Sequence, residues 1–332
     1  MIEVMPVSQG ANQGHTLSAR RARPSSVITD PGRGVSALLR PDAPQAEPSS
    51  LLGKDIAFRV SVLEACIARV EGALNDGSWS RRKDFTGVDL LLMPDLVQMA
   101  NERKPGLGLV YLAAPDTLGE LIERGVEKAG GTRYIVNVGP AGIHFAVIDC
   151  RVLEGHTSVI LFEPANMGRL GPLLMAQGTG QSVSARCSPA TCHFLHAEMD
   201  IQRSGSECGV FSLALAKKLH KEHDALTPLH QMNVSGGFSR SRYISPAEID
   251  RYLPPSFYKH AQGRGRIADY LTINPDAGQT LINKKQQTLL ERFKGGVEEV
   301  DGKAISKSAH NKRLVELKLF ERHLQQPSRV PA

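Results

Sequence analysis

The sequence has little of what membrane-spanning and disulfide-stabilised proteins require. No run approaches the roughly 18 apolar residues of a membrane helix, and no hydrophobic leader is recognisable after Met1, so stable membrane insertion is not expected. The five cysteines are odd in number and lack the spacing of a disulfide framework, which indicates a reducing environment. The net charge of +6 is moderate and favours an anionic partner, and nucleic acid is not expected.

The composition is otherwise that of a globular protein with one unusual end. Of the 332 residues, 41% are hydrophobic and 22% are charged, which gives enough material for one large domain or two smaller ones. Residues 1–50 are rich in Ser, Pro, Gly, Ala, Gln and Arg, and cannot bury enough surface to offset the entropy of ordering. We predict a disordered segment there, of a kind that suits secretion and translocation as an unfolded chain.

Hydrophobic periodicity predicts regular elements in the rest of the chain. Apolar residues at helical spacing predict helices over 54–74, 93–103, 118–128, 283–293 and 306–324. The second of these is expected to open with Pro94 in its first turn. Runs rich in β-branched residues predict strands over 107–112, 133–138, 143–152 and 158–162, the last three as antiparallel neighbours. Residues 178–196 fit no element and are expected to be a surface insertion.

The stretch 201–212, IQRSGSECGVFS, combines a cysteine with the start of a predicted helix. Residues 210–220 place apolar side chains at helical spacing, so Cys208 lies at or just before a helix N-terminus. Free N–H groups and the helix dipole there favour the thiolate form of a cysteine. Gln202, six residues upstream, could offer an amide donor to the oxygen of a carbonyl that Cys208 attacks. The alternative is an inert core cysteine, although the flanking Gly, Ser and Glu residues are poor core formers.

Two neighbouring predicted strands supply the partners that a nucleophilic thiol needs. His144 falls at the start of strand 143–152, and Glu163 falls at the end of strand 158–162. Adjacent strands joined by a tight turn can bring these two positions within reach of one another. Glu163 would then hold one ring nitrogen of His144, and the other nitrogen would deprotonate Cys208. Each residue alone has an ordinary structural interpretation, whereas the ordered set of His, Glu, Gln and Cys is far more specific.

A second group of cysteines and histidines raises the question of a metal. Cys187, Cys192, His193 and His196 form a C-x4-C-H-x2-H pattern, which lacks the paired spacing of structural zinc sites. We therefore expect no metal and interpret these residues as part of the surface insertion.

Four blocks of the sequence carry a resemblance to a known family. They are GIHFAVID at 142–149, SVILFEPA at 158–165, DIQRSGSECGVFSLALAKKL at 200–219 and YLPPSFYKHAQG at 252–263. In content and order they resemble the YopJ family of bacterial type III effectors, over about residues 52–325. The same order of residues also resembles the wider clan of cysteine proteases that cleave ubiquitin-like modifiers.

The resemblance implies a role for each of the residues named so far. His144 matches the general base of the family, Glu163 the residue that orients it, and Cys208 the nucleophile. Gln202 matches a glutamine that lines the oxyanion site in the clan. The acetyl donor would be acetyl-CoA, and the activator would be inositol hexakisphosphate (IP6).

Four cations match family positions associated with these two ligands. Lys259 matches a lysine near the CoA and activator sites, also discussed as a site of autoacetylation. Arg103 matches a position associated with the inositol phosphate, and Lys312 and Arg313 match a C-terminal helix that contributes cationic groups. The alternative for all four is a solvated basic surface.

The resemblance implies a type III secreted effector that enters the host cell cytoplasm. It would acetylate Ser, Thr and Lys residues of host signalling proteins, with MAP kinase kinases as the expected partners, and thereby suppress immune signalling. Transfer through an acetyl-cysteine would give ping-pong kinetics.

The expected fold is α+β, with a core of the ubiquitin-like-protease type and a helical regulatory subdomain. The expected division is a disordered segment over 1–50, a catalytic core over 51–282, regulatory helices over 283–325 and a tail over 326–332. Two other functions use the same residues. One is a cysteine protease or isopeptidase with the same triad, and the other is a non-catalytic protein that inhibits kinases by binding them.

Overall fold

The computed structural model of the chain describes residues 51, 53–125, 131–140, 142–238 and 242–326. The predictions for segment 1–50 and for nearly all of the tail fall outside the described residues. The helices are α2 (Ile56–Asn75), α3 (Phe85–Arg103), α4 (Leu118–Arg124), α5 (Leu170–Arg186), α6 (Cys208–Lys221), α7 (Thr227–Val234), α8 (Pro246–Ile249), α9 (Arg264–Ile273), α10 (Leu289–Lys294) and α11 (Ser308–Gln325). The strands are β1 (Leu109–Leu112), β2 (Thr132–Asn137), β3 (Phe145–Leu153), β4 (His156–Glu163), β5 (Cys192–Glu198), β6 (Tyr243–Ile244), β7 (Val297–Val300) and β8 (Lys303–Ser306).

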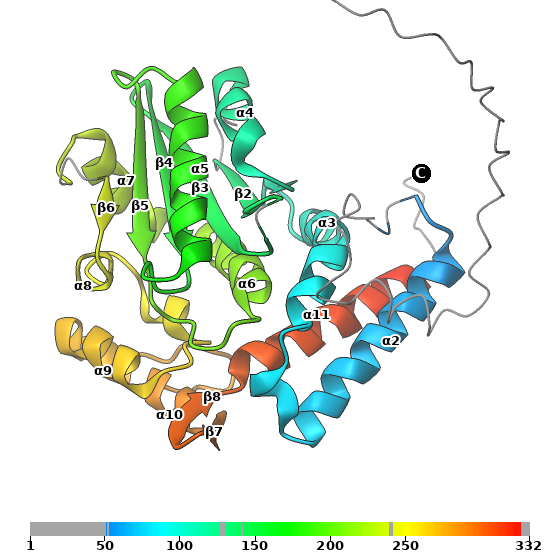
Figure 1. The fold of residues 1–332 in the computed structure, drawn as a ribbon. Coiled ribbons are helices and arrows are strands. Elements are labelled where there is room, and N and C mark those ends of the chain that lie inside the picture. The colour runs from blue at the N-terminus through cyan, green and yellow to red at the C-terminus, as the bar shows by residue number, and fades with distance from the viewer. Residues whose placement is uncertain (1–50, 52, 126–130, 141, 239–241, 327–332) are drawn as a thin grey trace, which may run out of the picture.

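Six strands form a mixed sheet in the order β1-β2-β3-β4-β5-β6, which stands upright in Figure 1. Strands β2, β3 and β4 are antiparallel neighbours, as predicted, whereas β1, β5 and β6 each run parallel to the strand beside them. A two-residue turn joins β3 to β4, where Glu154 and Gly155 both have positive φ, the backbone that a tight hairpin requires.

Helices cover both faces of the sheet because its central strands are apolar on both sides. On β3, Phe145 and Val147 belong to a core that includes the inward face of α6. The alternate residues Ala146 and Ile148 belong to a second core, which α4 and α5 close from the other side. The sheet is therefore sandwiched, and the predicted α+β fold is confirmed (Figure 1).

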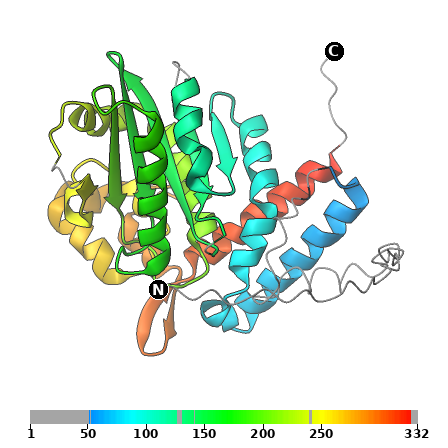
Figure 2. The same ribbon diagram turned by 45° about the horizontal axis from the view of Figure 1, so that its top comes forward.

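A helical part lies beside the sheet and joins distant segments of the chain. Helices α2 and α11 lie side by side in both Figure 1 and Figure 2, with α3 between them and the sheet. The guanidinium of Arg59 on α2 lies 5.6 Å from the ring centroid of Phe320 on α11, and Lys318 pairs with Glu71. The predicted packing of the C-terminal helix against the N-terminal helices is confirmed. However, 283–293 is helical only over α10, and the β7-β8 hairpin was not predicted.

Two other expectations were wrong. Pro94 lies inside α3, which begins at Phe85. A proline inside a helix costs about 3 kcal/mol, and the buried apolar residues of the preceding turns offset that cost by packing. Residues 178–196 are not a surface insertion, because they form most of α5 and the first part of β5, a strand bordered on both sides.

Across the described ranges, none of the helices combines the length and the apolar character that crossing a membrane requires.

Candidate active site

The register of β3 and β4 places His144 close to Glu163. Val147 pairs with Phe162, so the next residues inward, Ala146 and Glu163, are opposite one another. His144 is two residues beyond Ala146, and its backbone N–H donates to Oδ1 of Asn137 on β2 at 3.1 Å. A diagonal pair of this kind lies within reach of long side chains.

Glu163 holds the imidazole of His144 in one orientation. Its Oε2 lies 2.8 Å from Nε2 of His144, and its Oε1 accepts from the N–H of Ala165 at 2.8 Å. Burial alone lowers the pKa of His144, but the Glu163 carboxylate and a hydrogen bond with Cys208 outweigh burial and raise that pKa to about 10. The imidazolium is therefore the resting form at neutral pH, and its other nitrogen is left for Cys208.

The chain between β5 and α6 brings Cys208 to this pair. The N–H groups of Ile201 and Gln202 both donate to the carbonyl of Pro164, at 2.8 and 2.9 Å, so the loop runs beside the end of β4. Helix α6 begins at Cys208 itself, which is 2% exposed. The helix N-terminus presents free N–H groups near the sulfur, and the imidazole of His144 lies within hydrogen-bond reach of it. We refer to His144, Glu163 and Cys208 as the active-site triad, and the structure brings the three predicted residues together.

Two glycines are required by close approach to the triad. A Cβ on Gly209 would lie 2.5 Å from Oδ2 of Asp89, and that oxygen accepts from the N–H of Val210 at 3.2 Å. A Cβ on Gly171, in the first turn of α5, would lie 3.0 Å from Cγ of His144. Any larger residue at either position would push the nucleophile or the base out of place.

Free donors lie at the start of α6, whereas the amide of Gln202 is engaged in its own loop, so the oxyanion role of Gln202 stays a prediction. The side-chain Nε2 of Gln202 donates to the carbonyl of Ser204 at 2.8 Å, so its amide is used within its own loop. The N–H groups of Cys208 and Gly209 have no acceptor in the part of the chain that the structure describes. These two donors are free to receive a negative oxygen at the atom that Cys208 attacks.

A basic cavity of roughly 290 Å³ lies at the other end of α6. Its described lining contains a single carboxylate, Glu316, which pairs with Lys217 and Lys312. The cationic lining residues are Arg103, Lys104, Lys217, Lys218, Lys221, Lys259 and Lys312. The structure thus brings together three of the four predicted cations, from segments more than 50 residues apart. The four lysines that were not predicted could have been found in part from the i, i+3, i+4 spacing of 217, 218 and 221.

The charges in this cavity are only partly compensated. Burial and the neighbouring Lys221 lower the pKa of Lys218 to about 8. Burial, Arg292 and Lys312 lower the pKa of Lys259 in the same way. Cations that depress one another's pKa values gain from a bound polyanion, because its charge removes their mutual repulsion.

Arg313, predicted to contact the anionic ligands, does not line the cavity. Its guanidinium is 98% buried and binds Asp89 with two hydrogen bonds of 2.8 Å, as well as the carbonyl of Ser206. Lys312 and Arg313 are consecutive on α11, about 100° apart around the helix, and here Lys312 faces the cavity while Arg313 faces Asp89.

The Cys187–His196 cluster is divided by the fold. Within the described chain, no group of three or more His, Cys, Asp or Glu side chains could hold a metal ion. Cys187 and Cys192 lie close together at the start of β5, whereas His196 is buried farther along the strand, where burial lowers its pKa to about 4.

A second set of acid, histidine and hydroxyl lies inside the molecule. The imidazole of His230 on α7 lies between two strand residues, with Nε2 3.1 Å from Oδ2 of Asp149 and Nδ1 2.8 Å from Oγ of Ser158. All three side chains are fully buried. We refer to Asp149, Ser158 and His230 as the buried triad. It was not predicted, because its members come from separate segments without a motif.

Comparisons with known proteins place the chain in a family and match its fold to solved structures. The profile of the YopJ Serine/Threonine acetyltransferase family matches residues 63–319. The chain is 42% identical over 279 residues to the serine/threonine-protein acetyltransferase YopJ of Yersinia pestis, covering 82% of this chain and 93% of that protein. It is also similar to the solved structure of an AvrA deletion variant with IP6 and CoA, with a TM-score of 0.73 and 41% identity over 81% of this chain and 99% of that one. HopZ1a in complex with IP6 and CoA shares the fold, with a TM-score of 0.60 and 19% identity over 72% and 86% of the two chains.

Proposed function

This chain belongs to the YopJ family of serine/threonine acetyltransferases, and we propose that it acetylates host signalling proteins through an acetyl group carried on Cys208. The observation that most directly supports this proposal is the Glu163–His144 hydrogen bond of 2.8 Å beside a cysteine at a helix N-terminus. This arrangement supplies a nucleophile, a base and a residue that orients the base.

In the first half-reaction, the thiolate of Cys208 attacks the carbonyl carbon of the acetyl thioester. The N–H groups of Cys208 and Gly209 stabilise the negative oxygen. The bond between the carbonyl carbon and the CoA sulfur then breaks, and the departing sulfur takes the proton of the His144 imidazolium. The products are acetyl-Cys208, free CoA and a neutral imidazole.

In the second half-reaction, a hydroxyl or amine of the acceptor protein attacks acetyl-Cys208. Neutral His144 takes the proton of the acceptor, and the sulfur of Cys208 leaves as a thiolate. The thiolate and imidazolium of the resting state are thereby restored. Because one cysteine serves both halves in turn, we expect ping-pong kinetics. Gln202 would assist only if its amide left the Ser204 carbonyl.

The basic cavity is the proposed site of the activator IP6, and its rim would also receive the phosphates of CoA. Arg103, Lys259 and Lys312 are the predicted contacts, and Lys218 is added by the structure. The depressed pKa values of Lys218 and Lys259 fit a site completed by a polyanion. Phosphate groups pair well with such clusters of cations.

We further propose delivery by type III secretion into the host cytoplasm, with MAP kinase kinases as the acceptors. The similarity to YopJ over 93% of its length supports this choice. The acceptor residues would be Ser and Thr, and also Lys.

The function can be tested with labelled acetyl-CoA, a MAP kinase kinase, and the protein with and without IP6. We expect label on the kinase kinase only with IP6, and none with Cys208→Ala. Cleavage of a ubiquitin-like substrate without acetyl transfer would support the isopeptidase. Inhibition of the kinase by Cys208→Ala, without label or cleavage, would support the non-catalytic binding protein.

The cavity can be tested separately by calorimetry with IP6. Replacing Lys259 and Lys312 together with Ala should raise the Kd for IP6 about 100-fold, since each charged contact is worth about 1.5 kcal/mol. Replacing Lys284 and Lys285 together with Ala is the matched control, because these two exposed lysines lie outside the cavity. An equal loss in the control would mean that net charge, and not this cavity, binds the anion.

A further inference from the structure

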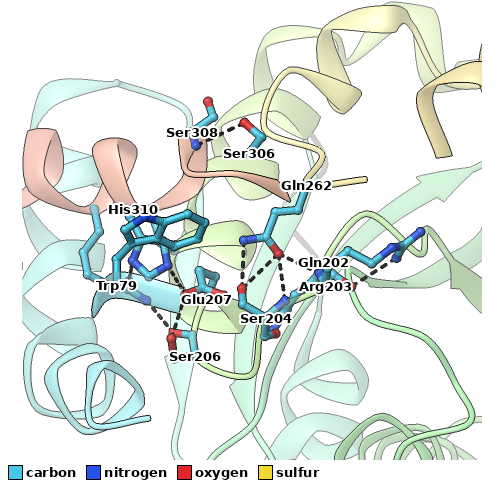
Figure 3. Close-up of polar contacts among 12 residues, drawn as sticks. Trp79, Gln202, Arg203, Ser204, Ser206, Glu207, Gln262, Ser306, Ser308 and His310 are labelled. Carbon is cyan, nitrogen blue, oxygen red and sulfur yellow. Dashed lines mark hydrogen bonds and ion pairs between the residues drawn. The ribbon is translucent and has the colours of Figure 1, made fainter. Parts of the chain in front are cut away.

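The loop before the nucleophile is held on its upstream side by one glutamine. The Oε1 of Gln262 accepts from the N–H of Arg203 at 2.6 Å and from the N–H of Ser204 at 3.1 Å. Its Nε2 lies 2.8 Å from Oγ of Ser204, and the backbone N–H of Gln262 donates to the carbonyl of Ile201 at 2.9 Å. Figure 3 shows this amide facing the loop from the segment that precedes α9. Gln262 is fully buried, so each of these bonds is protected from water.

The downstream side of the loop is held by α11. His310 pairs through Nε2 with Glu207, the residue before Cys208, and Ser206 donates to the same carboxylate at 2.6 Å (Figure 3). Arg313, one turn along α11, donates to Nδ1 of His310 at 3.2 Å and to the carbonyl of Ser206. Because a guanidinium can only donate, Nδ1 of His310 accepts this bond, and Nε2 is the ring nitrogen that lies against Glu207.

Asp89 of α3 completes the downstream contacts. Its carboxylate binds Arg313 with both oxygens and also accepts from the N–H of Val210 in the first turn of α6. Burying the Arg313–Asp89 ion pair beside the carboxylate of Glu207 is costly, and well-packed apolar residues would stabilise the fold at least as well. A buried polar network of this kind instead specifies one arrangement of the groups it binds, which here is the loop that carries Cys208.

The residues that make both sets of contacts are close in sequence to residues that line the basic cavity. Lys259 and His260 line the cavity and are followed two residues later by Gln262. Lys312 lines the cavity and stands between His310 and Arg313 on the same turn of α11. An anion that draws these lysines together therefore acts on the segments that hold the loop at both ends.

We propose that Gln262 and His310 are positioning residues that couple the occupancy of the basic cavity to the placement of Cys208. The inference rests on the proposed function only in naming IP6 as the anion. Filling the cavity fixes the 258–262 segment and the first turns of α11, and these fix the loop 201–207 from its two ends. Neither residue contacts the reacting atoms.

The test measures the reactivity of Cys208 without acetyl-CoA or an acceptor. The full chain is treated with iodoacetamide with and without IP6, and alkylation of the peptide that contains Cys208 is followed by mass spectrometry. We expect IP6 to raise the rate at least fivefold. In Gln262→Ala and in His310→Leu the increase should fall below twofold, while the Kd for IP6 stays within threefold of the wild type.

The matched control is Asn233→Ala, which removes a buried amide that binds Ser158 and the His193 carbonyl, away from the loop. It should lower the melting temperature comparably and leave the IP6 response intact. Loss of the response in this control as well would overturn the inference, because general destabilisation would then explain the result.

Conservative variants keep the test valid if the first variants fold poorly. Glutamate at 262 retains the acceptors for both N–H groups, and glutamine at 310 can donate to Glu207 and accept from Arg313. Gln262→Glu and His310→Gln should therefore recover at least one third of the response. Variants as unresponsive as Gln262→Ala and His310→Leu would contradict positioning, and so would a wild-type protein that binds IP6 without any change in alkylation. A wild-type protein that responds but transfers no acetyl group would overturn the proposed function alone.

Discussion

The active-site triad and the buried triad each combine residues in or next to β3 and β4 with one residue from a helix, and their residue types are similar, yet they differ chemically. In each, an imidazole lies between a carboxylate and a nucleophilic atom at hydrogen-bond distance or close to it. The pKa of His144 is raised to about 10, whereas the pKa of His230 is lowered, because burial outweighs its bond to Asp149 and the nearby Arg151 repels a second positive charge.

The comparison shows that residue types and distances do not by themselves make an active site. The carboxylate of Asp149 is also bound by Arg133 and Arg151, and the positive charge of Arg151 together with full burial disfavours an imidazolium at His230 despite its bond to Asp149. Ser158 receives a hydrogen bond from Asn233 and is sealed from solvent, whereas Cys208 begins a helix with two free N–H groups. The two triads therefore differ in three respects. Only the active-site triad has free N–H donors beside its nucleophile, a carboxylate that is not shared with arginine, and a position at the end of the sheet.

Removing the two nucleophiles should give the largest contrast. Cys208→Ala should lower acetyl transfer by at least about 10⁴-fold, because the covalent intermediate cannot form. Ser158→Ala should stay within threefold of the wild type. Initial rates of transfer from labelled acetyl-CoA, corrected for the folded fraction, decide the matter. Equal losses in both variants would make the buried triad part of the catalytic machinery.

Neutralising the two carboxylates should give a smaller but still clear contrast in rate. Glu163→Gln should lower kcat by about 10³-fold, because an amide orients the imidazole poorly and does not stabilise its cation. Asp149→Asn should change kcat of the folded protein by less than threefold. Steady-state kinetics at several pH values will show the change in Glu163→Gln. A kcat unaffected by Glu163→Gln would mean that His144 needs no acidic partner.

The effects of the two carboxylate variants on the free energy of unfolding should have the reverse order. Asp149→Asn leaves the guanidinium groups of Arg133 and Arg151 buried without their carboxylate, which should lower the free energy of unfolding by about 3–5 kcal/mol. Glu163→Gln leaves no such buried cation once His144 is neutral and should cost less. Urea unfolding of both variants measures the difference. A larger loss of unfolding free energy in Glu163→Gln would show that the active-site triad also contributes to the stability of the fold.

A smaller contrast is expected in how His144 and His230 affect the pH dependence of protein stability. His144, with its pKa raised from 6.5 to about 10, contributes stability that is complete below pH 6.5 and is lost as the pH rises toward 10. His230, with its pKa lowered, contributes stability above pH 6.5 that is lost as the pH falls. In melting curves from pH 5 to 10, His144→Gln should flatten the alkaline limb and His230→Gln the acidic limb. Exchanged effects would reverse the two assignments.

Local sequence patterns predicted the parts of the fold whose cause is local. Runs rich in β-branched residues predicted β2, β3 and β4, and helical spacing predicted α2 and α11 within a few residues. Local patterns misplaced the start of α3, because proline is common in the first turn of a helix and Pro94 therefore indicated a start there. Only the packing of the residues before Pro94 shows why the helix continues through this proline. Segment 178–196 was not predicted as regular structure. Its strand β5 has a neighbouring strand on each side and combines polar with apolar residues, so it lacks the regular apolar–polar alternation that identifies a half-buried strand.

For this protein, the sequence by itself determined the order of His144, Glu163 and Cys208 and the start of a helix at the cysteine. These features depend on residue type, spacing and local propensity. Only the tertiary structure decided that Arg313 turns inward to Asp89 while Lys312 faces the basic cavity. The same is true of the role of Gln262 beside the nucleophile loop and of the inert environment of His230. The reason is physical, because the direction of a side chain and the charges around it depend on segments that meet only after the chain has folded.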